Sequence, residues 1–109
     1  MGFAASAARR AMLTARLSDL QLQGQFINQA KMQIANMSNS LFNATTNLEP
    51  ESPQAQLIQQ RIAALQTIEK MLDMQLARLD SQEEAVKTEL EVLKKVIDES
   101  IARTFKTFG

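Results

Sequence analysis

The stretch NLEPESPQ, residues 47–54, decides how this 109-residue chain folds. It contains both prolines of the chain, and a proline disfavours helical geometry at the residue before it. Ser52 is suited to cap a following helix, because Pro53 then occupies the first helical position, where its missing N–H costs nothing. The stretch therefore predicts a turn at residues 48–52, marked by Pro50, Ser52 and Pro53, with a helix on either side.

The composition supports long helices on both sides of this turn. Only three glycines and two prolines occur, and aromatic residues make up 5% of the chain, so there are few places for the frequent turns of a sandwich or barrel. The sequence predicts an all-α fold in one domain, residues 1–109, with helices at about 4–47 and 53–107. Because the link is short, the helices are expected to form a long, coiled-coil-like antiparallel hairpin.

The second predicted helix carries the most regular apolar pattern. Steps of four and three lead through thirteen positions, of which ten are aliphatic, and this spacing predicts a seam against a partner helix. The positions are Ile58, Ile62, Leu65, Glu69, Leu72, Leu76, Leu79, Glu83, Val86, Leu90, Leu93, Ile97 and Ser100. An alternative is a break near residues 80–82, where Ser81 and Glu84 match a capping box, which would give a three-helix bundle.

The first predicted helix has a wider apolar surface than one partner helix covers. Its main stripe is Leu13, Leu17, Leu20, Gly24, Ile27, Lys31, Ile34, Ser38 and Leu41. Further apolar residues lie beside the stripe: Met12, Leu22, Phe26, Met32, Met37 and Phe42. This breadth predicts contacts beyond the hairpin itself.

The polar positions of the first helix hold amides in place of ions. Residues 23–47, QGQFINQAKMQIANMSNSLFNATTN, contain a single charge, Lys31. Neutral amides form hydrogen bonds in a crowded interface without the desolvation cost of ions, so this helix is suited to burial among copies of the chain. The alternative is a helix of an ordinary bundle, or a loosely ordered Asn/Gln-rich arm.

The composition excludes the common kinds of active site. Without histidine or cysteine, the chain has neither the usual catalytic triads nor the usual zinc ligands, and no phosphate-binding glycine loop occurs. We therefore expect no enzyme activity, no cofactor and no metal. The net charge of zero argues against a nucleic-acid partner, and no apolar run is long enough for stable membrane insertion.

Four short stretches of the sequence resemble parts of other proteins. The turn Pro50–Pro53 and the C-terminal stretch KKVIDESIARTFKTFG, residues 94–109, resemble type III secretion needle subunits, although both helices here are longer. The stretch Ile34–Ser38, IANMS, is similar to a motif of flagellar rod and hook proteins, without the glycine-proline element that follows it there. The opening residues 1–16 are similar to those of small uncharacterised bacterial proteins.

The resemblance implies a structural subunit that polymerises with itself and with other helical secretion components. It also implies export without a signal peptide to the cell surface or beyond; otherwise the chain is expected to be cytoplasmic. The alternative is a soluble coiled-coil adaptor or secretion-chaperone-like module. The predicted contacts between copies are Phe26, Ile27, Ile34, Asn36, Ile97, Ile101, Phe105 and Phe108.

Overall fold

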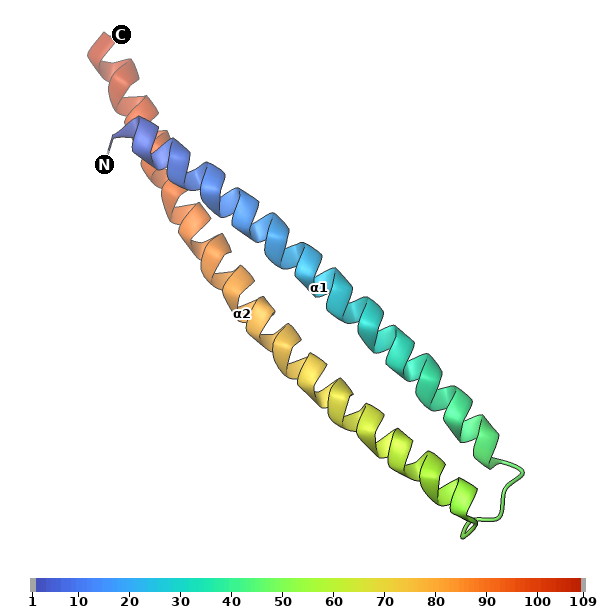
Figure 1. Cartoon of the computed structure of the whole chain (residues 1–109). Helices are drawn as coiled ribbons and strands as arrows, with labels where there is room; N and C mark the ends of the chain where they lie inside the picture. Colours follow the sequence, from blue (N-terminus) through green and yellow to red (C-terminus); the bar gives the residue numbers. More distant parts are fainter. Residues whose placement is uncertain (1, 109) are drawn as a thin grey trace. The chain divides into compact units, whose positions relative to one another are not determined.

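The computed structural model contains two long helices, α1 (Phe3–Thr45) and α2 (Pro53–Phe108), joined by a turn (Figure 1). It describes the backbone of residues 2–108 and the side chains of residues 2–106, and this part of the chain contains no strand. The predicted all-α helical hairpin is therefore confirmed.

Helix α2 continues without interruption through residues 80–82, so the alternative three-helix bundle is wrong. The apolar seam stays in register from Leu79 to Val86, and a continuous helix keeps both side chains on the same face. Ser81, which suggested a capping box, is an exposed residue in the middle of the helix.

Local hydrogen bonds close the turn and start α2. The backbone N–H of Ala55 donates to Ser52 Oγ at 3.1 Å, so Ser52 is the N-cap of α2. The N–H of Ser52 donates to the carbonyl of Glu49 at 3.1 Å, which closes a β-turn with Pro50 in its second position. The turn therefore uses the residues that the sequence assigned to it.

The helices group into two compact units. The terminal unit comprises Met1–Gln23 and Leu79–Gly109, and the turn unit comprises Gly24–Arg78. Within each unit, a segment of α1 runs antiparallel to a segment of α2. The single domain of residues 1–109 stays a prediction.

Each unit buries its own seam of apolar side chains. The terminal unit buries Leu13, Leu20, Leu79, Leu93 and Ile97, and the turn unit buries Ile34, Ala55, Ile62 and Leu65. All of these except Ala55 lie at predicted seam positions, because residues three and four apart share one face of a helix. Two helices bury only one such face each, so the other faces in both units remain exposed.

An ion pair also joins the two segments of the terminal unit. Arg9 Nη2 lies 2.9 Å from Glu89 Oε1, and Arg9 Nε donates to the same oxygen at 3.0 Å. Both side chains are about half exposed, so the pair contributes at most about 1 kcal/mol. The apolar seam therefore dominates the pairing of the helices.

Candidate interaction surface

The turn unit carries a broad apolar surface on one side of its seam. Steps of four and three along α1 give Phe26, Ala30, Gln33, Met37, Ser40 and Ala44, and the same steps along α2 give Leu57, Arg61, Ala64, Ile68, Met71 and Gln75. Each series shares one helix face. The two series lie on the same side of the seam, because members of both line one groove. We call these twelve residues the apolar flank.

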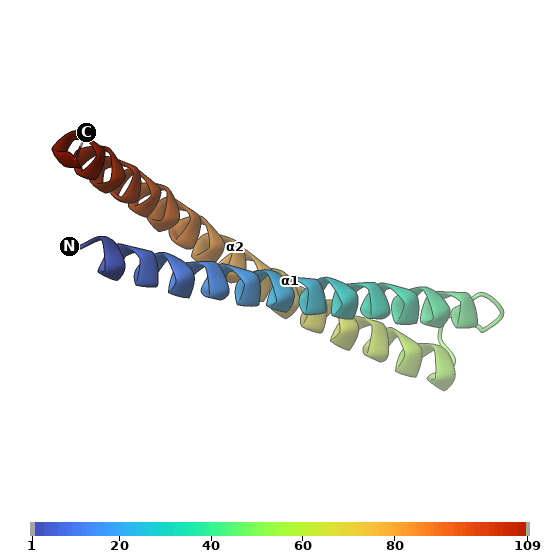
Figure 2. The same cartoon turned by 90° about the horizontal axis from the view of Figure 1, so that it is seen from above.

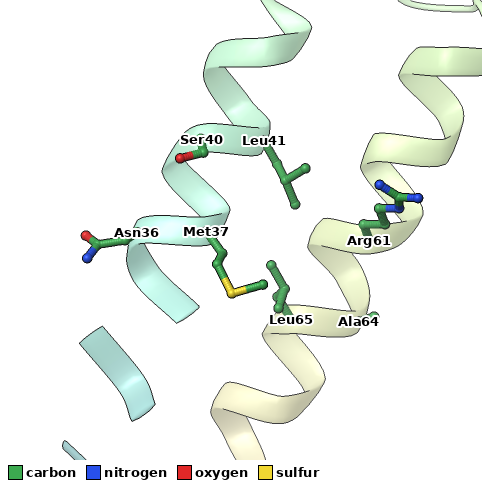
Figure 3. A pocket seen from close by; sticks show the side chains of 7 residues that line it. All are labelled: Asn36, Met37, Ser40, Leu41, Arg61, Ala64 and Leu65. Atoms are coloured by element: carbon green, nitrogen blue, oxygen red, sulfur yellow. The ribbon is translucent and has the colours of Figure 1, made fainter. Parts of the chain in front are cut away.

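The groove lies between the two helices of the turn unit and has a volume of about 550 Å³. Figure 3 shows Met37 and Leu41 of α1 pointing toward Leu65 of α2, while Asn36 points away from α2. Arg61 and Ala64 complete the α2 wall, and Ser40 lies on the α1 side. The groove is therefore an apolar trough with one cation at its edge.

The apolar flank combines large exposed side chains with very little charge. Five large apolar residues on it are exposed: Phe26, Met37, Leu57, Ile68 and Met71. Arg61 is its only charged residue, and no ion pair or hydrogen bond of Arg61 occurs among the described residues. A contiguous exposed apolar surface of this kind is typical of an interaction site.

Charge is unevenly divided between the two units. Residues 24–78 contain eight charged side chains, and the remaining residues, almost equal in number, contain sixteen. A charged side chain must be removed from water when an interface covers it, and this desolvation costs free energy. The turn unit therefore resists close approach by another helical surface less than the terminal unit does.

The opposite side of the turn unit carries six amides on two further series of residues. Its α1 series is Gln25, Asn28, Met32, Ala35, Asn39 and Phe42, and its α2 series is Gln56, Gln59, Ala63, Gln66, Lys70 and Asp73. We call this side the amide flank. The amide side chains on it are exposed, so they remain free to form hydrogen bonds outside the hairpin.

One ion pair lies at the edge of the turn-unit seam. Lys31 occupies a seam position of α1, with its side chain 30% exposed, and its Nζ pairs with Asp73 of α2. The hydrogen bond to Asp73 raises the pKa of Lys31 above its ordinary value of 10.5, and the negative charges of Asp73 and Glu69 raise it further, against the opposing effect of desolvation. The pair therefore links α1 to α2 at the edge of the seam.

This shift predicts a loss of stability at alkaline pH. The folded state holds the Lys31 proton more tightly than the unfolded state, so the contribution is fully present below pH 10.5 and is lost as the pH rises through the raised pKa. Urea unfolding between about pH 9 and pH 12 should show a steeper loss of unfolding free energy in the wild type than in Lys31→Met. The variant Lys70→Met should behave like the wild type, and parallel curves for all three proteins would contradict the prediction.

The terminal unit carries a second, smaller apolar surface where α2 runs past the start of α1 (Figure 1). Phe3, Ile101 and Phe105 are exposed there, and Phe105 is 75% exposed. They line a groove of about 370 Å³, and α2 diverges from α1 toward its C-terminal end (Figure 2). We call these three residues the end patch.

The residues predicted to contact other copies fall into two groups. Ile34 and Ile97 are buried in the seams of their own units and Ile27 is half-buried, so these three are covered by the hairpin itself. Phe108 is outside the range of residues 2–106 whose side chains the structure describes. The exposed members are Phe26, Asn36, Ile101 and Phe105.

The α2 half of the apolar flank was missed by the sequence analysis. Leu57, Ile68 and Met71 were not assigned to any contact, although they follow the same steps of four and three beside the seam. This second apolar series on α2 was the feature of the sequence that could have predicted the surface. That this series lies on the same side of the seam as Met37 depends on how the two helices are aligned, which spacing along one helix does not give.

No cluster of three or more potential metal ligands occurs among residues 2–108, and no helix in this range is long and apolar enough to cross a membrane. No family model, curated protein sequence or solved structure matches this chain.

Proposed function

We propose that this protein is a structural subunit that assembles with copies of itself. The observation that carries the proposal is the apolar flank, in which five large exposed apolar residues surround a single charge, Arg61. Covering such a surface removes apolar area from water, which stabilises an assembly by about 25 cal/mol per Å² before the cost of association. A second copy of the chain supplies a helical surface for this purpose.

The proposed assembly is a filament or rod of a secretion-type apparatus. The resemblance of the turn and the C-terminal stretch to needle subunits supports this setting, as does the similarity of Ile34–Ser38 to the rod motif. A confirmed hairpin fold with little charge in the turn unit is compatible with close helical packing between subunits.

The second candidate is a coiled-coil adaptor or secretion-chaperone-like module of fixed stoichiometry. The turn unit exposes four methionines, namely Met32, Met37, Met71 and Met74. Flexible, polarisable methionine side chains adapt to partners of different shape and are common on surfaces that bind several helices. This observation favours a heterologous partner over a second copy.

The concentration dependence of the mass separates the two candidates. Sedimentation velocity of the full chain at neutral pH, over about a hundredfold range of concentration, should show a mass that grows with concentration. Negative-stain electron microscopy of the most concentrated sample should then show filaments or tubes. A constant small mass across the range would contradict self-assembly, and a fixed dimer or trimer would favour the adaptor.

A further inference from the structure

We propose that the end patch of one copy docks in the turn-unit groove of a second copy, with Asp98 of the first copy paired to Arg61 of the second. The inference rests on the proposed self-assembly and names its contact surfaces. It is carried by two apolar surfaces on different units and by the charges beside them.

The end patch presents an apolar ridge with one acid beside it. Asp98, Ile101 and Phe105 are separated by three and four residues, so they lie along one face of α2. All three are exposed, and Asp98 forms no ion pair or hydrogen bond among the described residues. The ridge therefore carries a negative charge about one helical turn from its first large apolar side chain.

The groove presents the complementary pattern. Arg61 lies four residues before Leu65 on α2, so its positive charge is also about one helical turn from the apolar floor. A ridge seated with Ile101 and Phe105 against Met37, Leu41 and Leu65 brings Asp98 beside Arg61. Each unpaired charge then gains a partner at the edge of an apolar contact, where an ion pair is less screened than in water.

The charge pattern disfavours the alternative, in which the groove is covered by the same groove of a second copy. A two-fold contact centred on the groove would bring Arg61 close to Arg61 of the other copy, and like charges disfavour that approach. Docking of the end patch avoids this repulsion and also covers Phe105. Such a heterologous contact leaves a pair of copies with one free groove and one free end patch, and an assembly with free surfaces continues to grow unless it closes into a ring.

Two exposed positions allow each half of the contact to be removed without disturbing a seam. Phe105→Glu places a charge on the end patch, and Met37→Glu places a charge in the groove. Val92→Glu is the control, because it adds the same charge at another exposed apolar position of α2. Sedimentation velocity should show that Phe105→Glu and Met37→Glu each weaken self-association at least tenfold. Val92→Glu should associate like the wild type, and circular dichroism should show unchanged helicity in all three.

Mixing the two defective variants gives the decisive result. The Phe105→Glu variant has an intact groove, and the Met37→Glu variant has an intact end patch. The end patch of Met37→Glu can therefore dock in the groove of Phe105→Glu, and an equimolar mixture should form a 1:1 dimer and nothing larger. A mixture that stays monomeric would overturn the end-to-groove contact, whereas dimers of Phe105→Glu alone would indicate a two-fold interface between grooves. Normal assembly of Phe105→Glu would overturn the inference but leave the proposed function standing, whereas a wild type that never associates would overturn both.

Charge exchange tests the ion pair itself. Arg61→Asp and Asp98→Arg should each weaken association at least tenfold, and the double variant should recover most of the loss because the charges are then exchanged. Additive losses in the double variant would overturn the pairing of Asp98 with Arg61.

Discussion

Replacing Leu20 by alanine is expected to lower the free energy of unfolding by about 3 kcal/mol. Leu20 lies in α1 of the terminal unit and is 0% exposed, and it is the largest side chain buried to this degree among the described residues. Truncation removes its transfer free energy and also leaves a cavity, because the facing helix closes the gap only partly. With few buried apolar residues in each seam, the loss is a large fraction of the stability of the hairpin.

Leu22→Ala is the matched control, since Leu22 lies two residues farther along the same helix and is 48% exposed. Both changes replace leucine by alanine in α1, so helix propensity and effects on the unfolded chain largely cancel. Leu22→Ala should cost less than about 1 kcal/mol. Urea unfolding followed by circular dichroism at 222 nm provides the comparison, and equal losses in the two variants would contradict the assigned seam of α1.

The hairpin could be predicted from sequence because its determinants are local. The N-cap at Ser52 and the proline at residue 53 define the start of α2 by backbone chemistry alone. The two seams follow from spacing, and every predicted seam position except Glu69 is buried or half-buried. Glu69 is exposed because a charged side chain reaches water from the edge of a two-helix seam, where no third helix covers it.

The remaining features depend on contacts between helices that spacing does not encode. Ser6 is 1% exposed and continues the α1 stripe seven residues before Leu13, but a serine gives no apolar signal, and its Oγ has no hydrogen-bond partner among the described residues. The apolar flank was missed for a related reason. It forms only where Met37 of α1 and Arg61 of α2 line the same groove, which depends on how the two helices are aligned across the turn.

Replacing Met71 by glutamate is expected to weaken self-association at least tenfold and to leave the hairpin folded. Met71 is 55% exposed on the apolar flank, so the change removes no buried contact within the turn unit. In an assembly, however, the new carboxylate would be taken out of water without a partner, at a cost of several kcal/mol. Sedimentation velocity over a concentration series measures the shift, and the ellipticity at 222 nm checks that the helices are retained.

Gln66→Glu is the matched control because it adds the same charge to α2 of the same unit, at an exposed position of the amide flank. It should leave association nearly unchanged if the apolar flank is the contact surface. Salt separates burial from long-range repulsion: about 0.5 M salt screens exposed charges but does not remove the desolvation cost of a buried one. Met71→Glu should therefore stay dissociated at high salt, and recovery to the wild-type level, or an equal defect in Gln66→Glu, would contradict burial of this flank between copies.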